Sequence, residues 1–163
     1  MNIYDMDLYL ILYLIFAVAP ISIVLHEFGH AFAARVVNAD DIIISIGKGK
    51  QCKVIGFNRI QLIFHTVFFL GGLAESRRTE PYKKGELVWI AISGPITNAL
   101  IAFLIYMLNE MYPNNYLQLF FSFNIWLAVV NIIPLKVKEK NTDGYMIMKL
   151  IFWRSSKEKR KLK

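Results

Sequence analysis

The stretch VLHEFGHAFAARV at residues 24–36 contains His26, Glu27 and His30 in the pattern H-E-x-x-H. On a helix, residues four apart lie on one face, so both imidazoles can bind one cation. Glu27 then lies beside the metal, where a carboxylate can take a proton from water. Catalytic zinc takes three protein ligands and keeps one open position. The pattern therefore predicts a catalytic zinc site that still lacks one ligand.

The segment before the motif, DLYLILYLIFAVAPISIVL at 7–25, is apolar enough to lie in a lipid bilayer. Ionisable side chains are costly at that depth, and they mark functional sites. Two histidines and a glutamate compensate one another there when they share a metal. If Arg35 marks the cytoplasmic boundary, His26 lies nine residues further in, or about 13 Å at a helical rise of 1.5 Å per residue.

Two residues are candidates for the third ligand. Asp143, in NTDGYMIMKL, follows the last apolar segment on the same side of the membrane as the histidines. Its Asp-Gly pair, followed by apolar residues at helical spacing, resembles a helix start, so a metal ligand and a plain N-cap are equally open. His65, in IFHTVFF, is a lone histidine among aromatic residues, where a hydrogen-bonded packing residue is the commoner case.

The composition indicates an integral membrane protein. The 163 residues, one domain's worth, are 56% hydrophobic and 19% charged, with a mean hydropathy of +0.42. Three segments, at about 8–37, 87–109 and 117–133, are long and apolar enough to span a bilayer. The first has no basic leader and no small-residue cleavage site, which favours a retained span over a signal peptide.

Residues 38–86 lie between the first two spans. Their glycines, and the alternation of apolar and polar residues between them, are typical of short β-hairpins. The apolar part, IQLIFHTVFFLGGLA at 60–74, is expected to dip into the membrane. The predicted fold is thus an α-helical integral membrane protein, a single domain over 1–163. It has a three-transmembrane-helix core and a membrane-associated β-hairpin region between the first and second helices.

The positive charges predict the topology. Nine Lys and Arg residues lie at 35–84 and ten at 136–163, together all 19, and none lies in the first seven residues or at 110–116. Because positive residues stay in the cytoplasm, we expect a multi-pass protein of the cell membrane with its N-terminus outside. The 38–86 region, the C-terminus and the active-site opening would face the cytoplasm. The basic tail RSSKEKRKLK at 154–163 is expected to meet anionic lipid headgroups rather than nucleic acid.

Three blocks of the sequence resemble the site-2 protease family of intramembrane zinc metalloproteases (M50 type), in a minimal bacterial form. They are HEFGH, SGPITNALIA at 93–102, and NIIP…DG from 131 to 144. The segment FFLGGLAES at 68–76 also resembles the glycine-rich end of the family's membrane-associated hairpin. The blocks span nearly the whole chain in the family's order.

The resemblance implies that His26, His30 and Asp143 bind one Zn²⁺ per chain and that Glu27 is the general base. One departure concerns the segment before Asp143. LKVKEKNT at 135–142 is longer and more charged than the family's connection. Glu139, in that segment, is therefore an alternative third ligand.

The resemblance also implies that Gly94, Pro95 and Asn98 belong to a helix packed against the site, with Asn98 in contact with the substrate backbone. Glycine permits close helix approach, and proline frees a backbone carbonyl. Helix packing alone is the alternative for all three. Asn131 and Pro134 would shape the turn that delivers the third ligand.

The activity implied is hydrolysis of a peptide bond in or near a transmembrane segment of a membrane protein or membrane-bound peptide. Edge strands within 42–70 could hold the extended substrate by strand addition. The alternative is a non-catalytic metal-binding scaffold, which the presence of Glu27 disfavours. The oligomeric state is left open.

Overall fold

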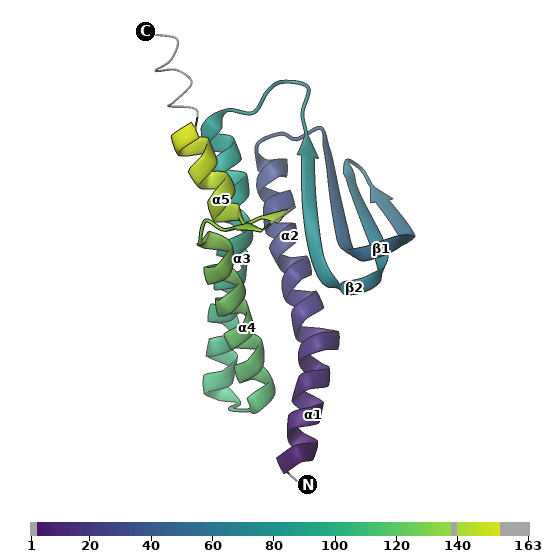
Figure 1. The fold of residues 1–163 in the computed structure, drawn as a ribbon, viewed down its shortest axis with the longest axis vertical. Helices are drawn as coiled ribbons and strands as arrows, with labels where there is room; N and C mark the ends of the chain where they lie inside the picture. The colour runs from purple at the N-terminus through teal and green to yellow at the C-terminus, as the bar shows by residue number, and fades with distance from the viewer. Residues whose placement is uncertain (1–2, 138–139, 154–163) are drawn as a thin grey trace.

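The computed structural model describes residues 3–137 and 140–153. Three long apolar helices stand side by side, and a small antiparallel sheet covers one of them (Figure 1). Each of the three helices is long and apolar enough to cross a membrane. The ranges that could span the membrane end within three residues of those expected from the sequence. The first helix itself begins earlier, at Ile3.

The first long helix is continuous through a widened turn. It consists of α1 (Ile3–Tyr13), the π-helical segment η1 (Leu14–Val18) and α2 (Ala19–Val36). Pro20 cannot donate a backbone hydrogen bond, which favours a widened turn just ahead of it. Asn38, at a φ of 61°, then adopts the left-handed conformation that asparagine tolerates and turns the chain towards the sheet.

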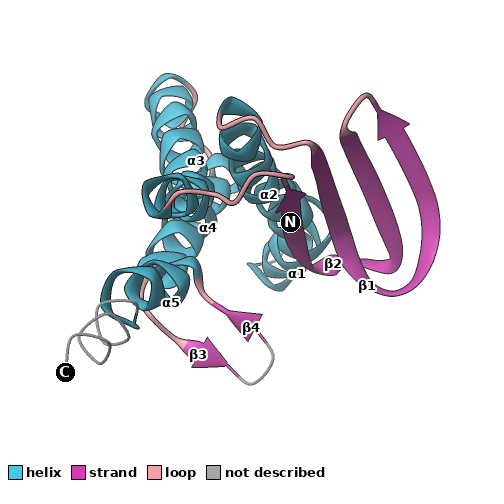
Figure 2. Cartoon of the chain, turned by 90° about the horizontal axis from the view of Figure 1, so that it is seen from above, coloured by secondary structure: helices cyan, strands magenta, loops and turns pink. Residues whose placement is uncertain are grey.

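The sheet consists of β1 (Asp41–Phe57) and β2 (Ile60–Arg77), which pair antiparallel. Both strands are longer than the short hairpins expected from the sequence, and both bend back strongly (Figure 2). Residues 42–46 have partners on two sides, in 60–64 and in 72–76. Residues 72–76 pair with 42–46, and no second strand among the described residues pairs with them, so this segment is an edge of the sheet.

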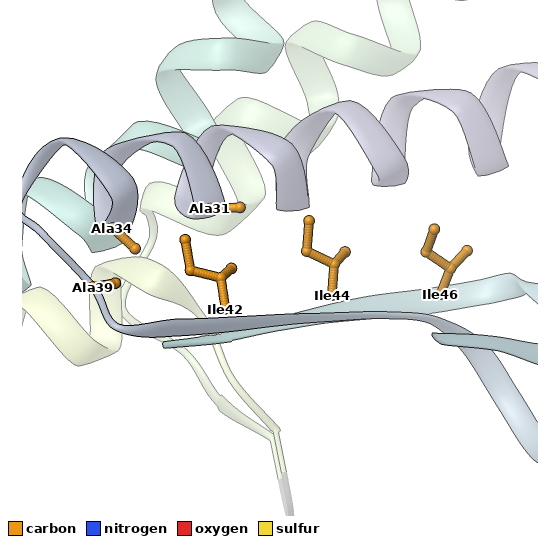
Figure 3. Close-up of a cluster of buried hydrophobic side chains, with 6 residues drawn as sticks. All are labelled: Ala31, Ala34, Ala39, Ile42, Ile44 and Ile46. Atoms are coloured by element: carbon orange, nitrogen blue, oxygen red, sulfur yellow. The ribbon is translucent and has the colours of Figure 1, made fainter. Parts of the chain in front are cut away.

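The sheet packs on α2 through a small apolar core. Ile42, Ile44 and Ile46 alternate along β1, so all three project from one face, and all three are buried. They point at α2, where Ala31 and Ala34 face them (Figure 3). The small side chains on the helix let the sheet approach closely.

The other two long helices are α3 (Lys84–Met111) and α4 (Asn115–Ile132). Residues 112–114 join them, and the side chain of Asn114 caps α4 by accepting a hydrogen bond from the backbone N–H of Leu117 at 2.9 Å. Helix α3 packs against both α2 and α4. The short strands β3 (Lys136–Val137) and β4 (Lys140–Asn141) lead to α5 (Asp143–Met148) and the π-helical segment η2 (Lys149–Trp153), and α5 packs on α3 and α4.

Arg78, just after β2, ties the sheet to two helices. Its guanidinium donates to the carbonyl of Val37 at 2.7 Å, after α2, and to the carboxylate of Glu86 at 2.8 Å, in the first turn of α3. Nearby, the backbone N–H and hydroxyl of Thr79 donate to Asp40 at 2.7 and 2.9 Å, and these bonds lower the pKa of the Asp40 carboxyl. The sheet is thus fastened at the C-terminal end of α2, beyond the H-E-x-x-H motif.

Candidate active site

His26 and His30 lie one turn apart on α2, and both side chains point at the first residue of α5. Their Nε2 atoms are 3.2 Å apart. Asp143 places Oδ2 at 3.1 Å from His26 Nε2 and Oδ1 at 3.4 Å from His30 Nε2. Both histidines are buried. Tertiary packing thus brings together the two histidines of the motif and an aspartate 117 residues further along the chain.

The spacing of these atoms fits a tetrahedral metal. With metal–ligand bonds of about 2.0 Å, two ligands of a tetrahedral zinc lie about 3.3 Å apart. The 3.2 Å between the two Nε2 atoms and the 3.1 Å from His26 Nε2 to Asp143 Oδ2 are close to that value. The second carboxylate oxygen, Oδ1, lies 3.4 Å from His30 Nε2. The donor set, two imidazole nitrogens and one carboxylate, leaves a fourth position open, as catalytic zinc sites do.

The other ring nitrogen of each histidine has a partner. His30 Nδ1 donates to the carbonyl of Ile90 at 2.7 Å; because a carbonyl only accepts, Nε2 of a neutral His30 carries a free lone pair. His26 Nδ1 lies 2.5 Å from Oδ1 of Asn98. Lone pairs on both Nε2 atoms, next to a carboxylate, repel one another unless a proton or a metal ion lies between them. The donor arrangement therefore fits a bound metal ion.

Gly94 on α3 makes room for the two imidazoles. A Cβ at this position would lie 2.8 Å from His26 Nε2 and would collide with the ring of His30. Pro95, the next residue, is fully buried inside α3. It cannot donate a backbone hydrogen bond to the carbonyl of Ala91, four residues back. The neighbouring carbonyl of Ile90 is the acceptor for His30. Both residues therefore shape the helix face that borders the site.

Glu27 lies on α2 beside the two histidines and faces the sheet. It is 8% exposed, and its carboxyl accepts a hydrogen bond from the backbone of Ala74. A Cβ added to Gly72 would lie 2.6 Å from Glu27 Cγ. The backbone of the edge segment 72–76 therefore lies directly against the expected general base. The close approach at Gly72 was not recognised in the sequence, although the Gly-Gly pair marks it.

Asn98 is fully buried in a network that also includes Ser22 and Asn124. Neither of these two residues was singled out in the sequence. An amide in the middle of an otherwise apolar segment is the signal that could have found Asn124. The residues come from three different helices, and the network ends at His26.

The structure gives a different result for each alternative to Asp143 as the third ligand. His65 lies on β2, where its Nδ1 donates to the carbonyl of Ile46 at 3.3 Å, and it does not join the cluster. The interpretation of Asp143 as a plain N-cap is wrong, because Thr142 is the N-cap of α5 and accepts from the backbone N–H of Tyr145 at 3.3 Å. Glu139 and the basic tail 154–163 lie outside the described residues.

Comparison with known proteins identifies the family of the chain. The model of peptidase family M50 matches residues 13–114, more than half of the chain. The match includes the H-E-x-x-H motif and the α3 segment with Gly94, and it ends before Asp143. A search of curated proteins found no match. The chain belongs to peptidase family M50, the site-2 protease family.

Proposed function

We propose that this protein is an intramembrane zinc metalloprotease that cleaves a peptide bond in or near a transmembrane segment. The observation that carries the proposal is the convergence of His26, His30 and Asp143 at the spacing of tetrahedral zinc ligands. Membership of a peptidase family and three apolar helices of spanning length support it.

In this proposal the two histidines and the aspartate hold the metal, and Glu27 moves the proton. Bound zinc supplies Lewis-acid chemistry, which acidifies water and polarises a carbonyl. Glu27, next in sequence to His26, accepts the proton of the attacking water and passes it to the leaving amine. The neighbouring sheet and helices keep bulk water from Glu27, which is 8% exposed.

We place the substrate against the edge segment 72–76 of β2. A helical substrate must unwind before cleavage because its carbonyls are hydrogen-bonded, and an extended peptide can add to a sheet edge. The sequence pattern predicts this edge within 42–70. However, residues 42–46 are paired on both sides, and 51–57 form the edge farther from the helices (Figure 2). The edge at 72–76 lies at Glu27.

The proposed setting is the cell membrane, with three helices spanning the bilayer and the sheet associated with its cytoplasmic side. The charge distribution in the sequence supports an outside N-terminus and a cytoplasmic opening of the site. Partners would be a membrane protein or peptide as substrate and anionic lipid headgroups at residues 154–163. We propose no nucleic-acid partner.

The test uses zinc content and cleavage together. Purified protein in liposomes is mixed with a panel of labelled single-span peptides that carry helix-weakening residues at different depths. We expect wild type to bind about one zinc and cleave some of the panel, and Glu27→Gln to keep its zinc but cleave at least about 100-fold more slowly. Equal cleavage by the variant would refute the role of Glu27. Bound zinc without Glu27-dependent cleavage would favour the scaffold alternative.

A further inference from the structure

A fully buried polar network lies behind His26, and the proposed chemistry does not use it. Ser22 on α2, Asn98 on α3 and Asn124 on α4 are each 0% exposed. Buried amides in apolar helices are costly unless all their groups are paired. Among the described residues, no buried side-chain nitrogen or oxygen lacks a partner. The pattern of donors and acceptors in this network therefore has to be consistent from end to end.

The orientation of Asn124 is fixed from within its own helix. Its Nδ2 donates to the carbonyl of Phe120 at 2.9 Å and to the hydroxyl of Ser22 at 2.9 Å. A carbonyl only accepts, so the amino group of Asn124 must face Phe120. Its Oδ1 consequently faces Asn98.

Asn98 has no freedom to turn its amide over. Its Nδ2 donates to Asn124 Oδ1 at 2.8 Å and to the carbonyl of Ser22 at 3.2 Å. A flipped amide would set an oxygen against these two acceptors. Oδ1 of Asn98 is therefore the atom that faces His26 Nδ1, at 2.5 Å. An acceptor at this position requires a proton on Nδ1 and leaves the lone pair on Nε2.

We propose that Asn98 is a positioning residue that holds His26 in the Nδ1–H tautomer, and that Asn124 sets the orientation of Asn98. Metal-binding histidines are commonly held in this way by an acceptor on the second nitrogen. His30 has the same arrangement, with the backbone carbonyl of Ile90 as acceptor. Both amide hydrogens of Asn98 are used inside the protein, so this role replaces contact with the substrate backbone. The proposal rests on the proposed zinc site.

The first test is the rate at which zinc is lost to a chelator from protein in detergent. Leucine has the same branched skeleton as asparagine but cannot accept a hydrogen bond, so Asn98→Leu should lose zinc about 10- to 100-fold faster than wild type. Asn98→Asp keeps an acceptor towards His26 and should retain zinc better than the leucine variant. A residue that only packs would give the opposite order, because leucine suits an apolar interior better than a carboxylate does.

Two variants of α4 test whether Asn124 orients Asn98. Asn124→Leu touches no metal ligand but removes the acceptor that orients Asn98, and we expect zinc loss between wild type and Asn98→Leu. Ser122→Ala, on the same helix, removes an exposed hydroxyl that donates to Gln118 and should leave the rate unchanged. If Asn124→Leu matches Ser122→Ala, the relay from Asn124 is refuted.

A measurement on wild type needs no variant to fold. In ¹⁵N NMR of the labelled rings, His26 should carry its proton on Nδ1, with and without zinc. A proton on Nε2 of the metal-free protein, or metal on Nδ1, would overturn the inference. Wild type that binds no zinc would instead refute the proposed function, and the ring tautomer would still test the role of Asn98.

Discussion

The two halves of the candidate site are built differently. His26 and His30 come from one turn of a long helix, and their second nitrogens are held by Asn98 and by the Ile90 carbonyl of α3. Asp143 comes from a helix of six residues that follows two short strands. Its position depends on Thr142, whose hydroxyl donates to the carbonyl of Ile133 at 2.7 Å.

The difference shows that the metal ligands are positioned in two different ways. The histidine half is set by helical geometry and by tight packing of α2 on α3, so that one added methyl group should disturb both ligands. Asp143 is positioned by the connection between α4 and α5 and by the hydrogen bonds of Thr142, so small changes there should weaken zinc binding only gradually. Single substitutions can test this division.

The largest effect is expected in the histidine half, from Gly94→Ala. The new Cβ collides with the imidazole of His30 and crowds that of His26. Zinc affinity should therefore fall by more than the ~100-fold that loss of an outer partner can cost, as measured by chelator competition. Gly85→Ala on the same helix meets nothing within 4 Å and should bind zinc like wild type. Stoichiometric zinc in Gly94→Ala would contradict the close packing.

Asp143→Ala should come next. Zinc affinity should fall at least ~100-fold, because loss of a ligand costs no less than loss of an outer partner, and helix content should stay unchanged by circular dichroism. Both histidines stay in place, so some affinity remains. Asp41→Ala, at the exposed start of β1, is the matched control. A variant at Asp143 that keeps wild-type affinity would show that another residue is the third ligand.

Gly72→Ala should impair the general base, Glu27, without affecting metal binding. A Cβ there would press on Glu27 and displace its carboxylate. A displacement of ~1 Å can lower a rate by 10²-fold, and we expect a smaller displacement here. Peptide cleavage should fall about tenfold, while zinc binding stays normal. Gly56→Ala, in the same sheet, has nothing within 4 Å and should cleave normally. Loss of zinc in Gly72→Ala would place the sheet against the ligands instead.

The smallest effect is expected from Thr142→Val at the start of α5. Loss of the cap costs about 1 kcal/mol, which corresponds to roughly fivefold in zinc affinity if the cap positions Asp143. Thr142→Ser keeps the hydroxyl and should restore the affinity. If valine had no effect, the aspartate would be held by packing of α5 rather than by its cap.

The sequence alone predicted the three apolar helices, because length and hydropathy are local properties, and it predicted His26, Glu27 and His30 as a group, because a helix fixes residues four apart. It left the sheet too short, since the sharp bends of β1 and β2 come from pairing with distant partners. It also left open whether Asp143 is a cap or joins the histidines.

Only the tertiary structure decided which distant atoms meet. Asp143 reaches the histidines because Gly144 can lie against the end of α4, where a Cβ would collide with the carbonyl of Ile132. Asn124 meets Asn98 because α4 folds back on α3, and the edge at 72–76 reaches Glu27 because the isoleucines of β1 pack on the alanines of α2. A spacing along one helix is written in the sequence, whereas contacts between elements depend on how side chains of different helices and strands fill the space between them.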